Sequence, residues 1–343
     1  MCHFLIVRGL SCMRRSLNHA SPGCGTPEGN ADVAGEASDS RDLSTHYEHQ
    51  RPIFAGRFSN MKLGVYSIVL PDYRREDAAA KIAEIGYTGV EWTIGYPDRV
   101  FDSGEQWHVS LEHLEEDAPR AREVAERHGL DIPSLGSSSD TGDFEKIERL
   151  MKGAVAMGAP MLRIGSAHYD GSAHYGQLRE TVVRNYRTIE TMAADHGVKA
   201  LIEIHANTIC PSASAAMRIL EHFDPEHVGA ILDPGNMVIE GMERWRMGIE
   251  ILGPYLAHVH AKNMAWFQDE SGTWKWDNAS LEHGLANFEE IIATLREYGY
   301  DGYINLEDFR GGYCTAPVGI TTEEKLVEAH NYLTRLLGEQ PGS

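Results

Sequence analysis

The chain has 343 residues, 42% of them hydrophobic and 24% charged, which is typical of a globular protein with a large core. Its formal net charge is −20, and because the six arginines and six acidic residues of segment 1–60 cancel, residues 61–343 carry that whole charge. So acidic a surface repels nucleic-acid phosphates and anionic lipids, and we expect neither a nucleic-acid nor a membrane partner. The five cysteines form no CxxC pattern, and no apolar run is long enough to span a bilayer, so we expect a cytoplasmic protein.

Residues 1–60 are rich in glycine and polar residues and show no sustained hydrophobic period. Such a composition predicts a disordered N-terminal extension. Because Met61 opens the first clear strand, translation could instead start there, or the extension could be an arm that wraps a neighbouring subunit. The sequence leaves these alternatives open. Residues 339–343 form a short C-terminal tail.

From residue 61 to residue 338, short apolar runs alternate with amphipathic helical patterns, and the helices repeatedly end in glycine. The predicted strands are 62–67, 89–92, 130–135, 161–164, 199–204, 228–232, 256–261 and 302–307. The predicted helices are 75–86, 111–128, 143–157, 176–196, 212–222, 242–252, 286–298 and 321–338. Eight strand–helix units in sequence predict an α/β protein with a (β/α)8 TIM barrel over 61–338. The rival is a doubly wound open sheet, but no GxGxxG motif follows the first strand.

The last four predicted strands each end on a residue that can bind a metal: Glu203, Asp233, His260 and Glu307. In a barrel of parallel strands, these four side chains emerge at the same end. Three carboxylates and an imidazole would repel one another unless a divalent cation lay between them. We therefore expect a metal site. The ligands favour Mn²⁺ or Mg²⁺; Co²⁺ is also compatible, and Zn²⁺ is less favoured because no thiolate takes part.

Six further residues near the predicted strand ends are candidate substrate contacts: Trp92, Arg163, His205, Asn236, Lys262 and Arg310. For several of them an ordinary structural role is equally open: a core tryptophan, a loop histidine, a turn asparagine and a surface lysine. Arg163 lies inside an apolar run, so it needs an inward carboxylate partner, either Glu203 or Glu91. We expect His258 on the strand face opposite His260, as a packed or outer histidine.

The loop over residues 264–278 holds four aromatic residues in a polar stretch: Trp266, Phe267, Trp274 and Trp276. Exposed aromatic rings there are compatible with a lid that stacks on a sugar, or with a contact between subunits. The sequence favours neither reading.

The chain resembles the xylose isomerase-like superfamily of sugar isomerases and epimerases. The resemblance rests on Glu203 in Leu-Ile-Glu-Ile-His, Asp233 in Leu-Asp-Pro-Gly-Asn, His260 in His-Val-His-Ala-Lys-Asn and Glu307 in Ile-Asn-Leu-Glu-Asp. It implies a metal-dependent enzyme for a ketose or polyol-derived ketone. In that reaction Glu203 and Glu307 would bind the metal and exchange a substrate proton through an enediolate. A homo-oligomer is also expected.

The resemblance has one departure, because Asn236 stands where ketose 3-epimerases of this group often have a histidine. It therefore leaves room for the lyases of the superfamily. These are inosose dehydratases and the large subunits of 3-oxo-glycoside C-deglycosidases, which act with a small partner subunit. A non-catalytic sugar-binding barrel is the remaining alternative.

Overall fold

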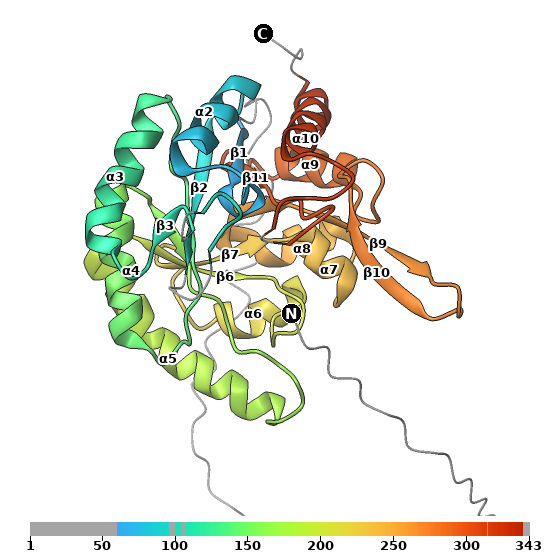
Figure 1. The fold of residues 1–343 in the computed structure, drawn as a ribbon. Helices are drawn as coiled ribbons and strands as arrows, with labels where there is room; N and C mark the ends of the chain where they lie inside the picture. The colour runs from blue at the N-terminus through green and yellow to red at the C-terminus, as the bar shows by residue number, and fades with distance from the viewer. Residues whose placement is uncertain (1–59, 96–99, 105–106, 314, 339–343) are drawn as a thin grey trace, which may run out of the picture. The chain divides into compact units, whose positions relative to one another are not determined.

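The computed structural model describes residues 60–95, 100–104, 107–313 and 315–338. The expected N-terminal extension, apart from its last residue, and the expected tail lie outside these residues. Eight parallel strands form a closed barrel, since β1 pairs with both β2 and β11, and this confirms the predicted fold (Figure 1). The strands are β1 (Lys62–Tyr66), β2 (Gly89–Gly95), β4 (Leu135–Gly136), β5 (Met161–Arg163), β6 (Lys199–Glu203), β7 (Val228–Leu232), β8 (Leu256–Ala261) and β11 (Tyr303–Leu306).

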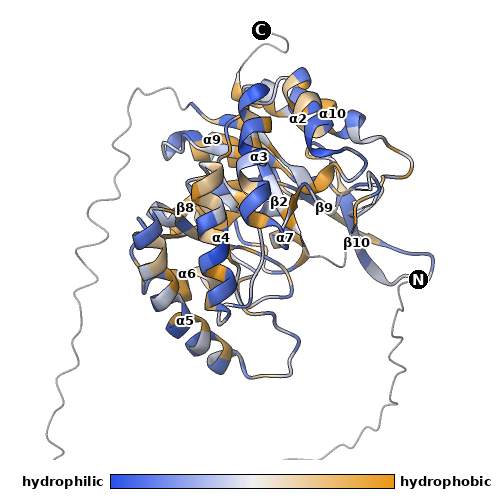
Figure 2. Ribbon diagram, turned by 60° about the vertical axis from the view of Figure 1, so that its left-hand side comes forward, coloured by the Kyte–Doolittle hydropathy of each residue, from blue (hydrophilic) through white to orange (hydrophobic). Residues whose placement is uncertain are grey.

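Helices surround this barrel and bury one face each against the strands. They are α2 (Arg75–Ile85), α3 (Leu114–Arg127), α4 (Phe144–Met157), α5 (Tyr175–His196), α6 (Ala213–Leu220), α7 (Pro234–Ile239), α8 (Trp245–Leu252), α9 (Phe288–Glu297) and α10 (Thr322–Leu337). Hydrophilic and hydrophobic residues alternate around helices such as α4 and α5 in Figure 2, as expected of amphipathic helices. Gly158 and Gly197 end these two helices with positive φ angles of 75° and 66°, a conformation that favours glycine. No helix in the described ranges is long and apolar enough to cross a membrane.

The strand predicted over 130–135 is mostly not a strand. Within the barrel only Leu135–Gly136 forms β4, and Asp131 makes a single isolated bridge with Gly89. Pro133 explains the difference, because proline has no backbone N–H to donate to a neighbouring strand. A further short strand, β3 (Val109–Ser110), extends the sheet beyond β2.

Two more elements were not predicted. Helix α7 follows β7 directly, with Pro234 in its first turn and the Asp233 side chain as its N-cap. The aromatic loop is an antiparallel hairpin of β9 (Asn263–Gln268) and β10 (Trp274–Ala279), in which Trp266 lies opposite Trp276. The Trp266 ring N–H donates to the Val238 carbonyl at 2.8 Å, which fastens the hairpin to α7.

Candidate metal centre

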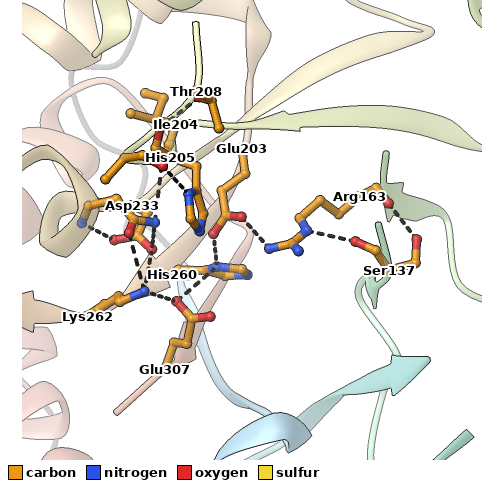
Figure 3. Close-up of polar contacts among 12 residues, drawn as sticks. Ser137, Arg163, Glu203, Ile204, His205, Thr208, Asp233, His260, Lys262 and Glu307 are labelled. Carbon is orange, nitrogen blue, oxygen red and sulfur yellow. Dashed lines mark hydrogen bonds and ion pairs between the residues drawn. The ribbon is translucent and has the colours of Figure 1, made fainter. Parts of the chain in front are cut away.

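Four side chains converge at the carboxyl ends of β6, β7, β8 and β11 (Figure 3). Glu203 ends β6, Asp233 follows β7, His260 lies near the end of β8, and Glu307 follows β11. All four residues are buried, and one potential ligand atom from each lies within 4.8 Å of the others. The structure thus brings together all four residues that the sequence proposed as ligands, and their adjacent strands explain why.

Two fixed cations balance the three carboxylates of this cluster. Arg163 of β5 forms an ion pair with Glu203 and donates from Nε to the Ser137 carbonyl at 2.7 Å. Lys262 Nζ donates to Glu307 Oε2 at 3.1 Å and lies 3.7 Å from Asp233 Oδ2. Burial raises the pKa of Glu203, but the Arg163 charge and the His260 hydrogen bond outweigh that effect and hold the pKa well below its usual value.

Asn236 fixes the position of Asp233. Its backbone N–H donates to Asp233 Oδ1 at 2.9 Å, and its side-chain amide donates to Oδ2 at 2.6 Å. The side-chain oxygen of Asn236, Oδ1, in turn accepts from Lys262 Nζ at 3.3 Å. Burial raises the pKa of Asp233, and the neighbouring charges of Glu307 and Glu203 add to the rise, while Lys262 opposes it. The predicted turn residue therefore orients the carboxylate at the centre of the cluster.

His260 presents its two ring nitrogens to carboxylates on both sides. Nδ1 lies 3.1 Å from Glu203 Oε1 and 3.7 Å from Glu307 Oε2, and Nε2 lies 3.2 Å from Glu91 Oε2. Burial lowers the pKa of His260, but the Glu91 and Glu203 carboxylates outweigh that effect and raise it well above the usual value. A positive charge, from a proton or from a metal ion, is therefore required between Nδ1 and the carboxylates. Three carboxylates and one imidazole nitrogen at this spacing fit a hard divalent cation.

The expected position of His258 is wrong. Residues two apart in a strand project from the same face, so His258 and His260 both point into the barrel. Their ring centroids are 5.4 Å apart, and His258 Nε2 lies 2.9 Å from Glu91 Oε2. Asn305 of β11 also donates to that oxygen, at 2.8 Å.

Sequence reasoning missed three contributors to the centre: Asn305, Tyr66 and Ser137. The Tyr66 ring stacks on the His260 imidazole with centroids 5.5 Å apart. Glu91 was expected only as one of two possible partners for Arg163, not as a partner of histidines. A polar residue inside an apolar run was the only available signal, and it fits Glu91 and Asn305.

A pocket of about 310 Å³ opens beside Glu203. It is lined by Ser138, Arg163, Ile164, Gly165, Ser166, His168, Glu203, His205, Ala206, Asn207 and Thr208. His205 reaches this pocket, and its Nδ1 lies 2.7 Å from the Ala206 carbonyl, so that nitrogen carries a hydrogen and Nε2 remains able to accept a proton. Of the six candidate substrate contacts, Arg163 and His205 line the pocket, while Lys262 and Asn236 contact the ligand carboxylates.

The structure does not bring Trp92 or Arg310 to the cluster. Trp92 is fully buried in the hydrophobic core and packs against His108, because strand alternation turns it away from the barrel interior when Glu91 points inward. Arg310 forms ion pairs with Asp308 at 2.7 Å and with Glu328 of α10 at 3.0 Å. The assignment of Trp92 as a substrate contact is wrong, because its side chain is fully buried, whereas that of Arg310, which is partly exposed, stays a prediction.

Two curated enzymes are similar to this chain in sequence. The 2-oxo-tetronate isomerase of Haemophilus influenzae is 22% identical over 261 residues, which cover 69% of this chain and 88% of that protein. The 3-dehydroshikimate dehydratase of Bacillus anthracis is 26% identical over 157 residues, which cover 40% of this chain and 52% of that protein.

Solved structures share the fold at low sequence identity. A xylose isomerase-like TIM barrel protein from Mycobacterium smegmatis in complex with magnesium has a TM-score of 0.59 and 19% identity, covering 81% of this chain and 96% of that chain. The IOLI protein with a zinc atom has a TM-score of 0.64 and 15% identity, covering 81% and 98%. The sequence profile of the xylose isomerase-like TIM barrel matches residues 79–336. The chain therefore belongs to the xylose isomerase-like TIM barrel family.

Proposed function

We propose that this protein is a metal-dependent isomerase or epimerase of a ketose or polyol-derived ketone. The observation that carries the proposal is the buried group of Glu203, Asp233, His260 and Glu307 at the catalytic end of the barrel. Its ligand chemistry favours Mn²⁺ or Mg²⁺, accommodates Co²⁺ and favours Zn²⁺ less. The isomerase among the curated relatives supports the reaction class.

A bound divalent ion would polarise a substrate carbonyl and make the C–H bond at the neighbouring carbon more acidic. Glu203 and Glu307 come from the outer strands of the β6–β7–β8–β11 series, so they flank the cluster from two sides. One carboxylate removes the proton beside the carbonyl, and the other returns a proton to the resulting enediolate. Arg163 and Lys262 are fixed cations next to these carboxylates, and they stabilise negative charge that develops on substrate oxygens.

A second candidate is a lyase that uses the same enediolate to expel a leaving group, which is a hydroxyl in an inosose dehydratase and the aglycone in a 3-oxo-glycoside C-deglycosidase. The feature that favours it is His205, which lines the pocket beside Glu203 and, once its Nε2 has taken up a proton, can deliver that proton to a leaving oxygen. The dehydratase among the curated relatives supports this alternative. A deglycosidase would also bring a small partner subunit, which co-purification would reveal.

Solvent exchange tests the proposal directly. Protein loaded in parallel with Mn²⁺, Mg²⁺, Co²⁺ or Zn²⁺ is incubated in D₂O with a ketose, an inosose or a 3-oxo-glucoside, and the sugars are read by mass spectrometry. An isomerase or epimerase incorporates deuterium without loss of water, whereas a lyase also yields a dehydrated or cleaved product. Asp233→Ala serves as the matched variant and should lose both stoichiometric metal and exchange. Absence of exchange in every substrate with metal bound would refute the proposal and leave a sugar-binding barrel.

A further inference from the structure

A second layer of buried polar groups lies inside the barrel beneath His260. Glu91 of β2, His258 of β8 and Asn305 of β11 are each 0% exposed. Three side-chain nitrogens converge on a single oxygen, Glu91 Oε2: His258 Nε2 at 2.9 Å, His260 Nε2 at 3.2 Å and Asn305 Nδ2 at 2.8 Å. A buried carboxylate in an apolar barrel is costly unless it is paired and hydrogen-bonded, and these three contacts meet that need.

The carboxylate decides which nitrogen of His260 carries the hydrogen. Glu91 Oε2 already accepts a hydrogen bond from the Asn305 side-chain amide, so a ring nitrogen that faced the same oxygen with a lone pair would be repelled. His260 Nε2 therefore carries the hydrogen and donates it to Glu91. When the imidazole is neutral, a hydrogen on Nε2 leaves the lone pair on Nδ1. Nδ1 is the nitrogen that faces Glu203 and Glu307.

We propose that Glu91 is a positioning residue, which fixes His260 in the tautomer that offers the Nδ1 lone pair to a divalent cation. The inference rests on the proposed metal centre and adds a role that none of its four ligands can perform. Hydrogen bonds of this kind from a ligating histidine to a carboxylate fix the ring orientation and increase the basicity of the ligating nitrogen.

Packing around Glu91 leaves Asn305 and the His260 ring, which contact its carboxylate, little freedom to move. Asn305 lies so close to Gly64 of β1 that a Cβ at position 64 would come within 2.2 Å of Asn305 Oδ1. On the other side, the Tyr66 ring stacks on the His260 imidazole. The Glu91 carboxylate and the His260 ring are thus confined from several strands, which is what an orienting contact requires.

The test compares Mn²⁺ affinity of the full chain in Glu91→Gln, in wild type and in Asp117→Asn. The amide that replaces the carboxylate in Glu91→Gln offers either a weaker acceptor or an N–H that would reverse the His260 tautomer, so we expect the dissociation constant to rise about 10- to 100-fold. Asp117 is the control, since its carboxylate is also largely buried and accepts from Arg75 at 2.9 Å, but it lies in α3 outside the ligand group. The control should bind Mn²⁺ like wild type, as measured by titration calorimetry and by the electron paramagnetic resonance signal of free Mn²⁺.

A second measurement needs no variant and covers the case in which Glu91→Gln does not fold. Nitrogen-15 NMR of histidine-labelled wild type loaded with diamagnetic Mg²⁺ should show His260 with its hydrogen on Nε2. A hydrogen on Nδ1 in the loaded protein would overturn the inference, and so would unchanged affinity in folded Glu91→Gln. Wild type that binds no metal would instead refute the proposed function, so the two failures are distinguishable.

Discussion

Arg163→Met tests whether a metal ion and a fixed cation share the task of neutralising Glu203. The Arg163 side chain is 19% exposed and that of Glu203 is 3% exposed, so this is a largely buried ion pair. Removing one partner of such a pair leaves an uncompensated buried charge and costs about 3–5 kcal/mol. We take the lower end, about 3 kcal/mol, because His260 also contacts Glu203. In a domain of this size that corresponds to a fall of roughly 6 °C in Tm.

A bound divalent ion would supply the missing positive charge, so the loss should shrink to about half once metal is saturating. The measurement is thermal unfolding by circular dichroism, in EDTA and in excess Mn²⁺, for wild type and Arg163→Met. The Mn²⁺-induced rise in Tm should be larger in the variant. Lys62→Met is the control, since its pair with Asp131 is about half exposed, and it should change stability by less than about 1 kcal/mol. Equal losses for Arg163→Met with and without Mn²⁺ would refute the reasoning.

Three further predictions concern the surroundings of the centre. Burial lowers the pKa of His108 from 6.5 to about 4, so the folded protein keeps this ring neutral while the unfolded chain takes up a proton below pH 6.5. Stability should therefore fall by about 3 kcal/mol between pH 6.5 and pH 4, and urea unfolding across this range should show a shallower fall for His108→Gln. Asn236→Ala removes the side-chain hydrogen bond to Asp233 and should weaken Mn²⁺ binding about tenfold by calorimetry, and an unchanged dissociation constant would contradict that role. In Gly136→Ala the new Cβ would meet the Tyr66 ring at 2.0 Å, so urea unfolding should show a loss of about 1–3 kcal/mol, whereas no loss would show that the ring moves freely.

The barrel and its four proposed ligands could be predicted because their signals are local. An apolar run that ends in Glu203 or Glu307 predicts, from a few residues, both a buried strand and a potential metal ligand at its carboxyl end. The order of strands in a (β/α)8 barrel then places consecutive strand ends together without any knowledge of side-chain contacts. The prediction of a strand over 130–135 was wrong for an equally local reason, because Pro133 has no backbone N–H to donate to a neighbouring strand.

The partners of those residues could not be predicted, because they depend on contacts between distant parts of the chain. Glu91 meets His258 across 167 positions, and Asn305 meets Glu91 across 214. Nothing in either local pattern specifies which polar residue faces which. The position of His258 needed only the two-residue period of a strand, and its assignment to the opposite face was an error in applying that period.

The proposed ligands and their supporting groups come from two different sets of barrel strands, and this affects how the chemistry of the site can change. All four proposed ligands come from β6, β7, β8 and β11, while each strand of the other half contributes a supporting group: Tyr66 on β1, Glu91 on β2, Ser137 just after β4, and Arg163 on β5. Substitutions on β1, β2, β4 and β5 can thus change the surroundings of the four proposed ligands while every ligand stays in place. A scaffold arranged in this way can diverge toward new reactions while it keeps all four proposed metal ligands.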